Sequence, residues 1–327
     1  MKVHYVRTYD GFKVGVIEWE PNNLSYKFPI LLIHGFAQNN LSWHGRSGGV
    51  APILRDKGFH VFSIDLRGSG YSRIRNLYYN YTFEDFVFKD IDSAVAFIRS
   101  RVGIDKVVLA GHSLGGICSY VFSSFFPDRV HAILTFGSPV HFGRGVGVIQ
   151  FFGGIAKILR KVPFSSVIYY FWPREFGMKL MGMFGLAGIP LMMNKKVLKI
   201  SPLYPSYTKN FESAWDFWEK LVKGFEFTSP RLLVQLLIWA SDKRITSFDG
   251  KIDYSKRFKD ISLPLFALAG TLDKVAPPIS VKPIVDIVSS SVKLYREYEA
   301  GHLDLIEGKL AKTKIVEDVE DFLRKLS

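Results

Sequence analysis

The segment "LAGHSLGG" (109–116) places Ser113 between two glycines, each two positions away. This Gly-x-Ser-x-Gly pattern presents a serine hydroxyl as a nucleophile when a strand precedes it and a helix follows. The alternative is a serine in an ordinary packing turn. The residues before the pattern, "KVVLAG" (106–111), are typical of a buried strand, and residues 114–126 are typical of a helix. Ser113 is therefore a candidate nucleophile.

A serine hydroxyl is a weak nucleophile and needs a general base, for which the chain offers eight histidines. His302 stands in a glycine-preceded loop after the last expected strand, and we predict it to be the base. His112 is next to Ser113, but in a tight turn its side chain should diverge from the serine. His34 belongs to a His-Gly turn, where a structural role is expected. The remaining histidines show no partner signal: His4, His44, His60, His131 and His141.

An imidazole base needs a carboxylate that orients it and stabilises its protonated form. Asp273 follows the strand-like run "LPLFALAG" (263–270) and precedes His302 in the chain. Asp304 lies only two residues beyond His302, which is too local to orient the ring easily. We therefore predict Asp273 as the acid.

The tetrahedral intermediate of acyl transfer needs N–H donors directed at its oxyanion. The backbone N–H of Leu114 stands at the expected N-terminus of the helix after Ser113, where the helix dipole favours negative charge. The second donor is expected from the backbone of Phe36, directly after His34 and Gly35. Both assignments depend on position alone, since a backbone donor needs no particular side chain.

These residues must be positioned by elements that alternate along the chain. The hydrophobic pattern predicts strands at 3–8, 12–19, 28–36, 59–66, 106–111, 130–139, 263–270 and 291–299. It predicts helices at 47–58, 82–102, 114–126, 278–288 and 310–326. Such alternation indicates a mostly parallel sheet with helices on both faces. Because ligands bind at the carboxyl ends of parallel strands, the candidate loops should open onto one edge.

The alternation stops near residue 140 and resumes near residue 263, which indicates an insertion before the penultimate strand. We expect an α/β core at 1–140 and 255–327, with a helical cap at 141–254. The cap is rich in Phe, Tyr, Trp, Met and Gly, which suits an apolar wall for an acyl chain. Basic residues among these stretches suggest peripheral contact with an anionic membrane: Lys157, Arg160, Lys161, Lys179, Lys195 and Lys196.

The composition narrows the class of protein. Lys and Arg number 43 against 30 Asp and Glu, a net charge of +13, but the basic residues are scattered and accompany no nucleic-acid motif. We expect a solvated basic surface and no nucleic-acid partner. The single cysteine, Cys118, excludes an intramolecular disulfide, a Cys-rich zinc site and an iron–sulfur cluster. A small buried core residue is its expected role.

Two segments bear on location. The N-terminal run "MKVHYVRTYDGFKVGVIEWE" alternates polar and apolar residues, without the apolar stretch of a signal peptide, so a cytoplasmic protein is expected. Residues 107–127 contain no Asp, Glu, Lys or Arg, which could indicate a membrane span. The glycines within them favour a buried strand, a turn and a buried helix instead.

Taken in order, five segments resemble the α/β-hydrolase superfamily: "LLIHGF", "SIDLRGSGYS", "LAGHSLGG", "ALAGTLDKVAPP" and "EAGHLDLIEG". They cover about 28–140 and 255–327. Within the superfamily the chain looks like the acid-lipase and polyhydroxyalkanoate-synthase branch. The resemblance implies an α/β-hydrolase fold, with Asp65 as a structural turn residue. It also implies the following site: Ser113 as nucleophile, Asp273 as acid, His302 as base, and Phe36 and Leu114 as oxyanion donors.

The chain departs from the polymer synthases at the nucleophile, where they carry cysteine and this sequence has Ser113. Serine also excludes the branches that use aspartate there, the haloalkane dehalogenases and epoxide hydrolases. The resulting expectation is a serine hydrolase acting on a lipophilic carboxylic ester, with no metal or organic cofactor. An acyltransferase or a carbon–carbon bond hydrolase could use the same three side chains, and a catalytically silent scaffold protein is the alternative outside enzymes.

Overall fold

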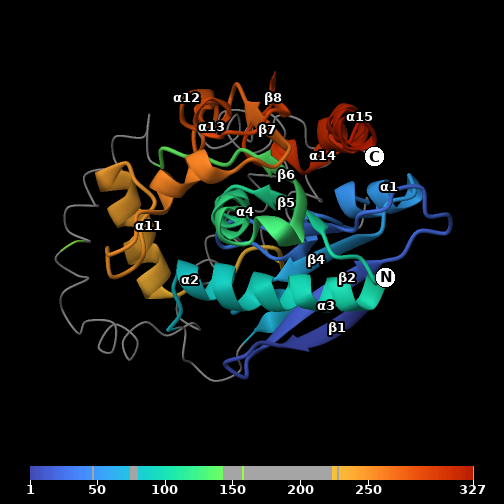
Figure 1. Cartoon of the computed structure of the whole chain (residues 1–327), viewed down its shortest axis with the longest axis horizontal. Coiled ribbons are helices and arrows are strands. Elements are labelled where there is room, and N and C mark those ends of the chain that lie inside the picture. The colour runs from blue at the N-terminus through green and yellow to red at the C-terminus, as the bar shows by residue number, and fades with distance from the viewer. Residues whose placement is uncertain (46–47, 74–79, 143–156, 158–222, 227, 327) are drawn as a thin grey trace, which may run out of the picture.

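The computed structural model describes residues 1–45, 48–73, 80–142, 157, 223–226 and 228–326. Within them, eight strands form one sheet in the order β1-β2-β4-β3-β5-β6-β7-β8 (Figure 1). Their bounds are β1 Lys2–Arg7, β2 Lys13–Trp19, β3 Ile30–Ile33, β4 Val61–Asp65, β5 Val107–His112, β6 Val130–Phe136, β7 Leu265–Gly270 and β8 Lys293–Tyr298. β2 pairs antiparallel with β1 and β4, and the other pairs are parallel. The mostly parallel sheet is confirmed.

Helices cover both faces of this sheet. The described helices are α1 Val50–Asp56, α2 Phe83–Asp85, α3 Asp92–Val102, α4 Leu114–Phe125, α11 Pro230–Asp242, α12 Pro278–Val281, α13 Ile284–Ile287, α14 Gly308–Leu310 and α15 Val316–Arg324. Figure 1 shows α3 and α4 together on one side, with α1 and α15 beside each other. Lys57, at the end of α1, bonds to Glu320 of α15, with 2.5 Å between Nζ and Oε2.

The two faces of β3 show how the sequence builds both layers. Because successive strand side chains point to opposite faces, alternate residues of a fully buried strand enter different cores. Leu31 and Ile33 pack into the core that holds α3 and α4. Ile30 and Leu32 pack into the core that holds α1 and α15. An unbroken apolar run is therefore what a central strand of this sheet requires.

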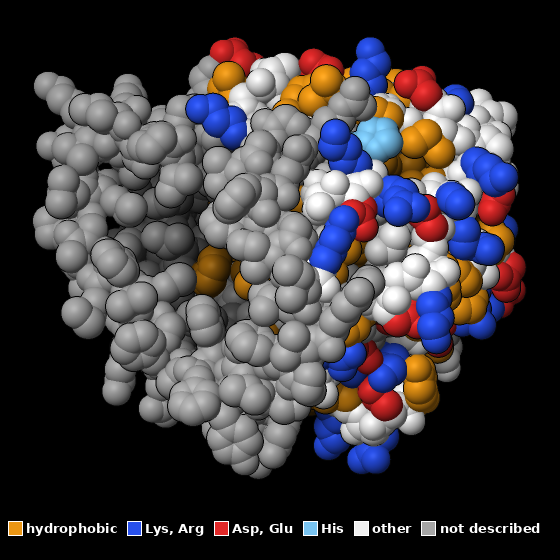
Figure 2. Space-filling model, turned by 90° about the vertical axis from the view of Figure 1, so that its left-hand side faces the viewer, with side chains coloured by type: hydrophobic (Ala, Val, Ile, Leu, Met, Phe, Trp, Pro, Cys, Tyr) orange, Lys and Arg blue, Asp and Glu red, His pale blue; other side chains and the backbone are white. Residues whose placement is uncertain are grey.

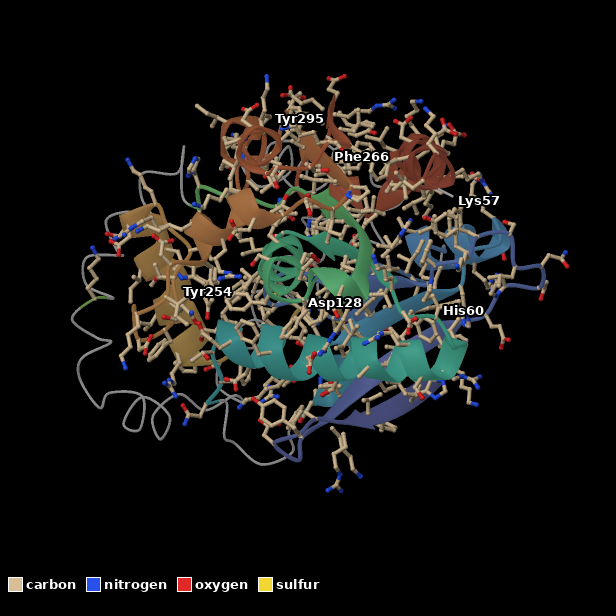
Figure 3. All side chains as sticks on the ribbon, in the orientation of Figure 1. Lys57, His60, Asp128, Tyr254, Phe266 and Tyr295 are labelled. Atoms are coloured by element: carbon tan, nitrogen blue, oxygen red, sulfur yellow. The ribbon has the colours of Figure 1, made fainter. Side chains whose placement is uncertain are left out.

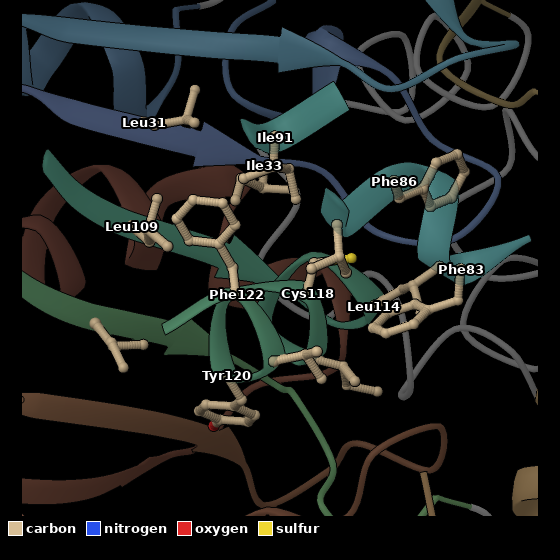
Figure 4. Close-up of a cluster of buried hydrophobic side chains, with 14 of the residues drawn as sticks. Leu31, Ile33, Phe83, Phe86, Ile91, Leu109, Leu114, Cys118, Tyr120 and Phe122 are labelled. Atoms are coloured by element: carbon tan, nitrogen blue, oxygen red, sulfur yellow. The ribbon is translucent and has the colours of Figure 1, made fainter. Parts of the chain in front are cut away.

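Figure 4 shows the core beneath α4, where Cys118 and Phe122 face Leu31, Ile33 and Leu109 of the sheet. Cys118 is fully buried there, as expected from the sequence. Burial raises the pKa of its thiol well above the ordinary value, so the thiol stays protonated and unreactive. Cys118 is a packing residue.

The expected helix 82–102 begins at Thr82, whose main-chain N–H donates to Oδ2 of Asp85 at 2.7 Å. It comprises α2, a wider π-type turn at Phe86–Ile91, and α3. Asp90 of this helix is fully buried, and its carboxylate accepts hydrogen bonds from Nε and Nη2 of Arg67 at 2.9 and 2.7 Å. Removing either partner would leave a buried charge uncompensated, which is strongly destabilising.

Two expected helices near the C-terminus are divided. The segment 278–288 forms α12 and α13 rather than one helix, because Pro283 lacks the N–H that a continuous helix needs. The segment 310–326 contains a π-type turn, Ala311–Ile315, between α14 and α15. Six of the eight strands lie within their expected ranges, and β3 is limited to Ile30–Ile33. β1 begins one residue before its expected range, and β5 ends one residue beyond its range.

Most of the expected cap at 141–254 lies outside the described residues, and so do five of the six basic residues named above for membrane contact. The sixth, Lys157, forms an ion pair with Asp242 at the end of α11. Among the described residues, no helix combines the length and apolarity that crossing a bilayer would need.

Charged side chains of both signs are interspersed over the described part of the face in Figure 2, so the excess of basic residues there forms no single patch. Side chains fill the layers on both sides of the sheet (Figure 3). Tyr254, labelled in that view, is fully buried and packs its ring against Phe83 of α2, with centroids 6.0 Å apart. The described part of residues 223–260 therefore joins the same body as the sheet.

Candidate active site

Ser113 occupies a strained turn between β5 and α4. Its φ of +52° lies in a region that side chains other than glycine rarely adopt, and its N–H donates to the carbonyl O of Phe136 at 2.9 Å. The flanking glycines permit the turn: a Cβ on Gly115 would lie 2.2 Å from the carbonyl O of Ile33, and one on Gly111 would lie 2.3 Å from Gly115. The expected strand–turn–helix setting is present.

The side chains of His302 and Asp273 contact each other beyond the carboxyl ends of β8 and β7. Nδ1 of His302 lies 2.6 Å from Oδ2 of Asp273, and both side chains are almost fully buried. The other carboxylate oxygen of Asp273 accepts the N–H groups of Val275 and Ala276 at 2.7 and 2.8 Å. A carboxylate held in this way fixes the ring with its Nδ1–H donating, which leaves Nε2 as the proton acceptor.

The loops that carry these two residues are tied together by backbone contacts. Thr271 N–H donates to Tyr298 O at 2.8 Å, and Leu272 N–H donates to Ala300 O at 3.0 Å. A Cβ on Gly270 would lie 2.3 Å from Ala300 O, so glycine permits the close approach. The ends of β7 and β8 thus hold an acid and a base that are far apart in sequence.

Neighbouring contacts place this pair beside the serine turn. His112, the residue before Ser113, has its Nε2 3.1 Å from the main-chain O of His302. Gly137 follows β6, and a Cβ there would lie 3.2 Å from both Asp273 Oδ2 and His302 Nδ1. The loops after β5, β6, β7 and β8 therefore meet at one edge of the sheet.

The two expected oxyanion donors also lie at this edge. Leu114 is the first residue of α4, so its N–H belongs to the positive end of that helix. A Cβ on Gly35 would lie 3.2 Å from Cβ of Ser113, which places the loop after β3 against the serine, and Phe36 follows directly. The arrangement can support a negatively charged oxygen next to Ser113.

His34 and Asp65, which we expect to be structural, both form buried hydrogen bonds with the backbone of neighbouring segments. His34 bonds through Nδ1 to Gly35 O at 2.9 Å and accepts the Leu66 N–H on Nε2 at 3.1 Å. Burial lowers the pKa of His34 to about 4, so the ring is neutral. Asp65 is fully buried and accepts the N–H groups of Asn40 and Tyr71 at 2.7 and 2.8 Å.

Sequence reasoning missed Gln38 and the role of His112. Oε1 of Gln38 accepts the Gly35 N–H at 2.8 Å and lies 3.0 Å from Nδ1 of His112. The ring of His112 contacts the loop of His302. Nothing local in the sequence indicates this bridge, because its two ends are separated by most of the chain.

The sequence shows no partner signal for the other histidines, but the structure gives partners to several of them. Nε2 of His44 lies 2.5 Å from Oδ1 of Asn40, and one carboxylate is shared by His4 and His60. Their Nε2 atoms lie 2.7 and 3.0 Å from the two carboxylate oxygens of Glu18, which Arg101 also contacts. Burial raises the pKa of Glu18, but these hydrogen bonds outweigh it and keep the pKa below the ordinary value. This cluster bridges β1, β2 and the start of β4, and it supports the fold.

Comparison with known proteins bears on the same elements. A family model described as the alpha/beta hydrolase fold matches residues 29–151, which include the His34 turn and the serine turn. The monoacylglycerol lipase of Paleococcus ferrophilus superposes with a TM-score of 0.64 at 17% identity, over 100% of both chains. This chain has the α/β-hydrolase fold. The likeness to that structure concerns the fold.

Curated relatives of this α/β hydrolase extend over nearly the whole chain. A probable lipase of Schizosaccharomyces pombe is 22% identical over 99% of this chain and 75% of its own length. The poly(3-hydroxyalkanoate) polymerase subunit PhaC of Haloferax mediterranei is 24% identical over 91% of this chain. The chain spans 59% of that subunit's length. The resemblance to both the lipase and the polymer-synthase branches is confirmed.

Proposed function

We propose that this α/β hydrolase is a serine hydrolase of lipophilic carboxylic esters. The observation that carries the proposal is the 2.6 Å contact between His302 Nδ1 and Asp273 Oδ2, at the edge where Ser113 occupies a strained turn. A buried, oriented imidazole beside a serine is the arrangement that nucleophilic acyl transfer requires.

In the first half-reaction, Oγ of Ser113 attacks the ester carbonyl while Nε2 of His302 takes its proton. The tetrahedral intermediate collapses, the C–O bond to the alcohol breaks, and His302 returns the proton to the departing oxygen. In the second half, His302 takes a proton from water, whose oxygen attacks the acyl-enzyme. The acid leaves as the proton returns to Ser113.

Asp273 does not exchange a proton in this scheme. Its carboxylate, fixed by two backbone N–H groups, keeps His302 in the tautomer that accepts at Nε2 and stabilises the imidazolium that forms. The backbone N–H groups of Phe36 and Leu114 receive the negative charge of the carbonyl oxygen. Loss of one such donor typically costs about 10²–10³ in kcat.

The substrate class rests on two supports. One relative is named a probable lipase, and a structure of the same fold is that of a monoacylglycerol lipase. The composition gives the second: residues 141–254 supply many Phe, Met and Trp side chains, which suit an apolar acyl group.

Acyl transfer is a second candidate, because another relative is named a poly(3-hydroxyalkanoate) polymerase subunit. The first half-reaction would be the same, and an alcohol would replace water in the second. Product analysis with water and a competing alcohol distinguishes the two: a hydrolase releases mainly free acid, and a transferase releases mainly the new ester.

The test of the proposal compares Ser113→Ala with wild type on p-nitrophenyl acyl esters of two to about eighteen carbons. Ser119→Ala is the matched control, because Ser119 lies on the same helix and its hydroxyl only donates to Gly115 O. We expect Ser113→Ala to lose turnover while folding normally, and Ser119→Ala to retain it. Undiminished turnover by purified Ser113→Ala would exclude Ser113 as the nucleophile.

A further inference from the structure

Glu226 is a buried carboxylate that the catalytic scheme does not use. Its side chain is 5% exposed, and one oxygen, Oε1, accepts hydrogen bonds from three residues. The donors are Nδ2 of Asn39 at 2.9 Å, the N–H of Gly70 at 2.9 Å, and Nη2 and Nε of Arg73 at 2.7 and 3.1 Å. A carboxylate with this many donors is fixed in place, and it joins three segments of the chain.

The first of these segments is the loop that holds the expected oxyanion donor Phe36. The main-chain N–H of Glu226 donates to Ala37 O at 2.8 Å, and Asn39 also donates to Lys223 O at 2.8 Å. Residues 223–226 therefore contact this loop through backbone and side chain together. The contacts fall on Ala37 and Asn39, within three residues of Phe36.

The loop needs such support because its backbone is strained. Ala37 has a φ of +54°, a left-handed conformation that costs free energy in any residue with a Cβ. A strained residue stays in place only where surrounding contacts hold it, and the bond to Ala37 O comes from Glu226. This N–H belongs to the main chain, so the carboxylate of Glu226 acts by anchoring Glu226 itself and Asn39. Without that anchor, the peptide of Phe36 could relax away from Ser113.

Asn40, the residue that follows this loop, is held by Asp65, whose two oxygens accept N–H and Nδ2–H of Asn40 at 2.7 and 2.6 Å. Gly70, bonded to Glu226, lies in the turn that follows Asp65. Arg73 balances the negative charge of Glu226, so the carboxylate need not disfavour an oxyanion nearby. The loop is thus fixed between two buried carboxylates.

We infer that Glu226 is a positioning residue that sets the oxyanion loop, residues 35–39, for catalysis. The inference rests on the proposed function, since the loop has this task only if Ser113 forms an oxyanion. Glu226 itself does not reach the reacting atoms. Its effect should appear in transition-state stabilisation, because misplacing a donor by about 1 Å can cost about 100-fold in rate.

Glu84 provides a matched control. Its carboxylate also accepts several hydrogen bonds, from Nε2 of Gln235 at 2.9 Å, the Phe248 N–H at 3.1 Å and the Tyr254 hydroxyl at 3.3 Å. It ties α2 to the residues around α11, and in the part of the chain that the structure describes it makes no hydrogen bond to residues 35–39. A loss of stability alone should therefore appear equally in Glu84→Ala and Glu226→Ala.

The experiment measures kcat and KM for p-nitrophenyl butyrate, and the rate at which a fluorophosphonate labels Ser113, in wild type, Glu226→Ala, Glu226→Gln and Glu84→Ala. Assays are run well below the melting temperature of each variant. We expect Glu226→Ala to lower kcat and the labelling rate about 10- to 100-fold with KM within about twofold of wild type. Glu226→Gln, which keeps an acceptor oxygen, should be intermediate, and Glu84→Ala should stay within about twofold in all three quantities.

Equal rates in Glu226→Ala and Glu84→Ala, with a reactive wild type, overturn this inference and leave the proposed function standing. A wild type that neither turns over the ester nor takes the label overturns both. If Glu226→Ala does not fold, Glu226→Gln decides: a kcat and labelling rate equal to those of wild type contradict the positioning role, and a selective loss of both supports it.

Discussion

The ring of His112 lies against the ring of His302, with centroids 4.6 Å apart, and its Nε2 lies 3.1 Å from the main-chain O of His302. Its Nδ1 lies 3.0 Å from Gln38 in the oxyanion loop. His112 thus connects the loop of the expected base to the loop of the expected oxyanion donors. Burial lowers its pKa well below the ordinary value, so it acts as a neutral support.

We predict that His112→Ala lowers kcat for p-nitrophenyl esters about 10-fold, because the loops of His302 and Gln38 lose a shared contact. KM should change less than about twofold, since no substrate contact is removed. Steady-state kinetics measure both values. His131→Ala is the control: His131 is stacked on Phe28, 3.6 Å between centroids, and has no contact with the site. A wild-type kcat in His112→Ala would contradict the supporting role.

Replacing the expected acid tests the orientation of the base. We predict that Asp273→Asn lowers kcat by about 10⁴-fold, because an amide in place of the carboxylate favours the wrong tautomer of His302. Asp304→Asn is the comparison: Asp304 accepts the Gly301 N–H at 2.8 Å and shapes the same loop. Asp304→Asn should lower the melting temperature, and its kcat should stay closer to that of wild type than the kcat of Asp273→Asn. A larger loss of kcat in Asp304→Asn than in Asp273→Asn would transfer the acid role to Asp304.

The tight packing around Gly115 in the serine turn leads to a prediction about stability. A Cβ at position 115 would lie 2.2 Å from Ile33 O, so Gly115→Ala should reduce the free energy of unfolding by about 3 kcal/mol or more. Gly103→Ala should cost only about 1–2 kcal/mol, because Gly103 has a φ of +73° but nothing within 4 Å of an added Cβ. Urea unfolding followed by circular dichroism measures both. Equal costs would mean that the close approach at Gly115 is relieved without strain.

The buried His34 makes a prediction about pH. Its pKa is lowered from 6.5 to about 4 by burial, so the unfolded chain binds a proton between these values that the folded chain does not. Stability from this group is fully present above pH 6.5 and falls as the pH decreases to about 4. The total is about 3 kcal/mol. His34→Gln should therefore show a shallower loss of unfolding free energy across this range, and an identical pH dependence would contradict the assignment.

Much of this fold follows from the sequence because its signals are local. Strand β3 is an unbroken apolar run. The glycines on either side of Ser113 predict a close approach between the strand before it and the helix after it. Asp273 and His302 were expected from their places after two strands, and the structure brings them within 2.6 Å. In a parallel sheet, chain order and topology together place such loops at one edge.

The features of the fold and the site that the sequence does not predict depend on contacts between residues far apart in the chain. The bond from Asn39 to Glu226 joins residues 187 positions apart, and the one from Gln38 to His112 joins residues 74 apart. Neither pair carries a periodic pattern or a motif, so only the folded chain shows them. Asp90 is similar: its helical position predicts burial, but its partner Arg67 comes from a turn elsewhere. Residues 141–222, most of the expected cap, lie almost entirely outside the described residues.

Ser113 is the residue that we propose to carry the acyl group during catalysis. The most direct measurement stops a reaction with a p-nitrophenyl ester in acid and locates the acyl group by peptide mass spectrometry, with His302→Ala as a variant that should not accumulate it. We predict acylation of the peptide at Ser113 in wild type, preceded by a burst of p-nitrophenol. Ester turnover with the acyl group on another residue, or with no acylated peptide and no burst under conditions where the acyl-enzyme should accumulate, would contradict the account.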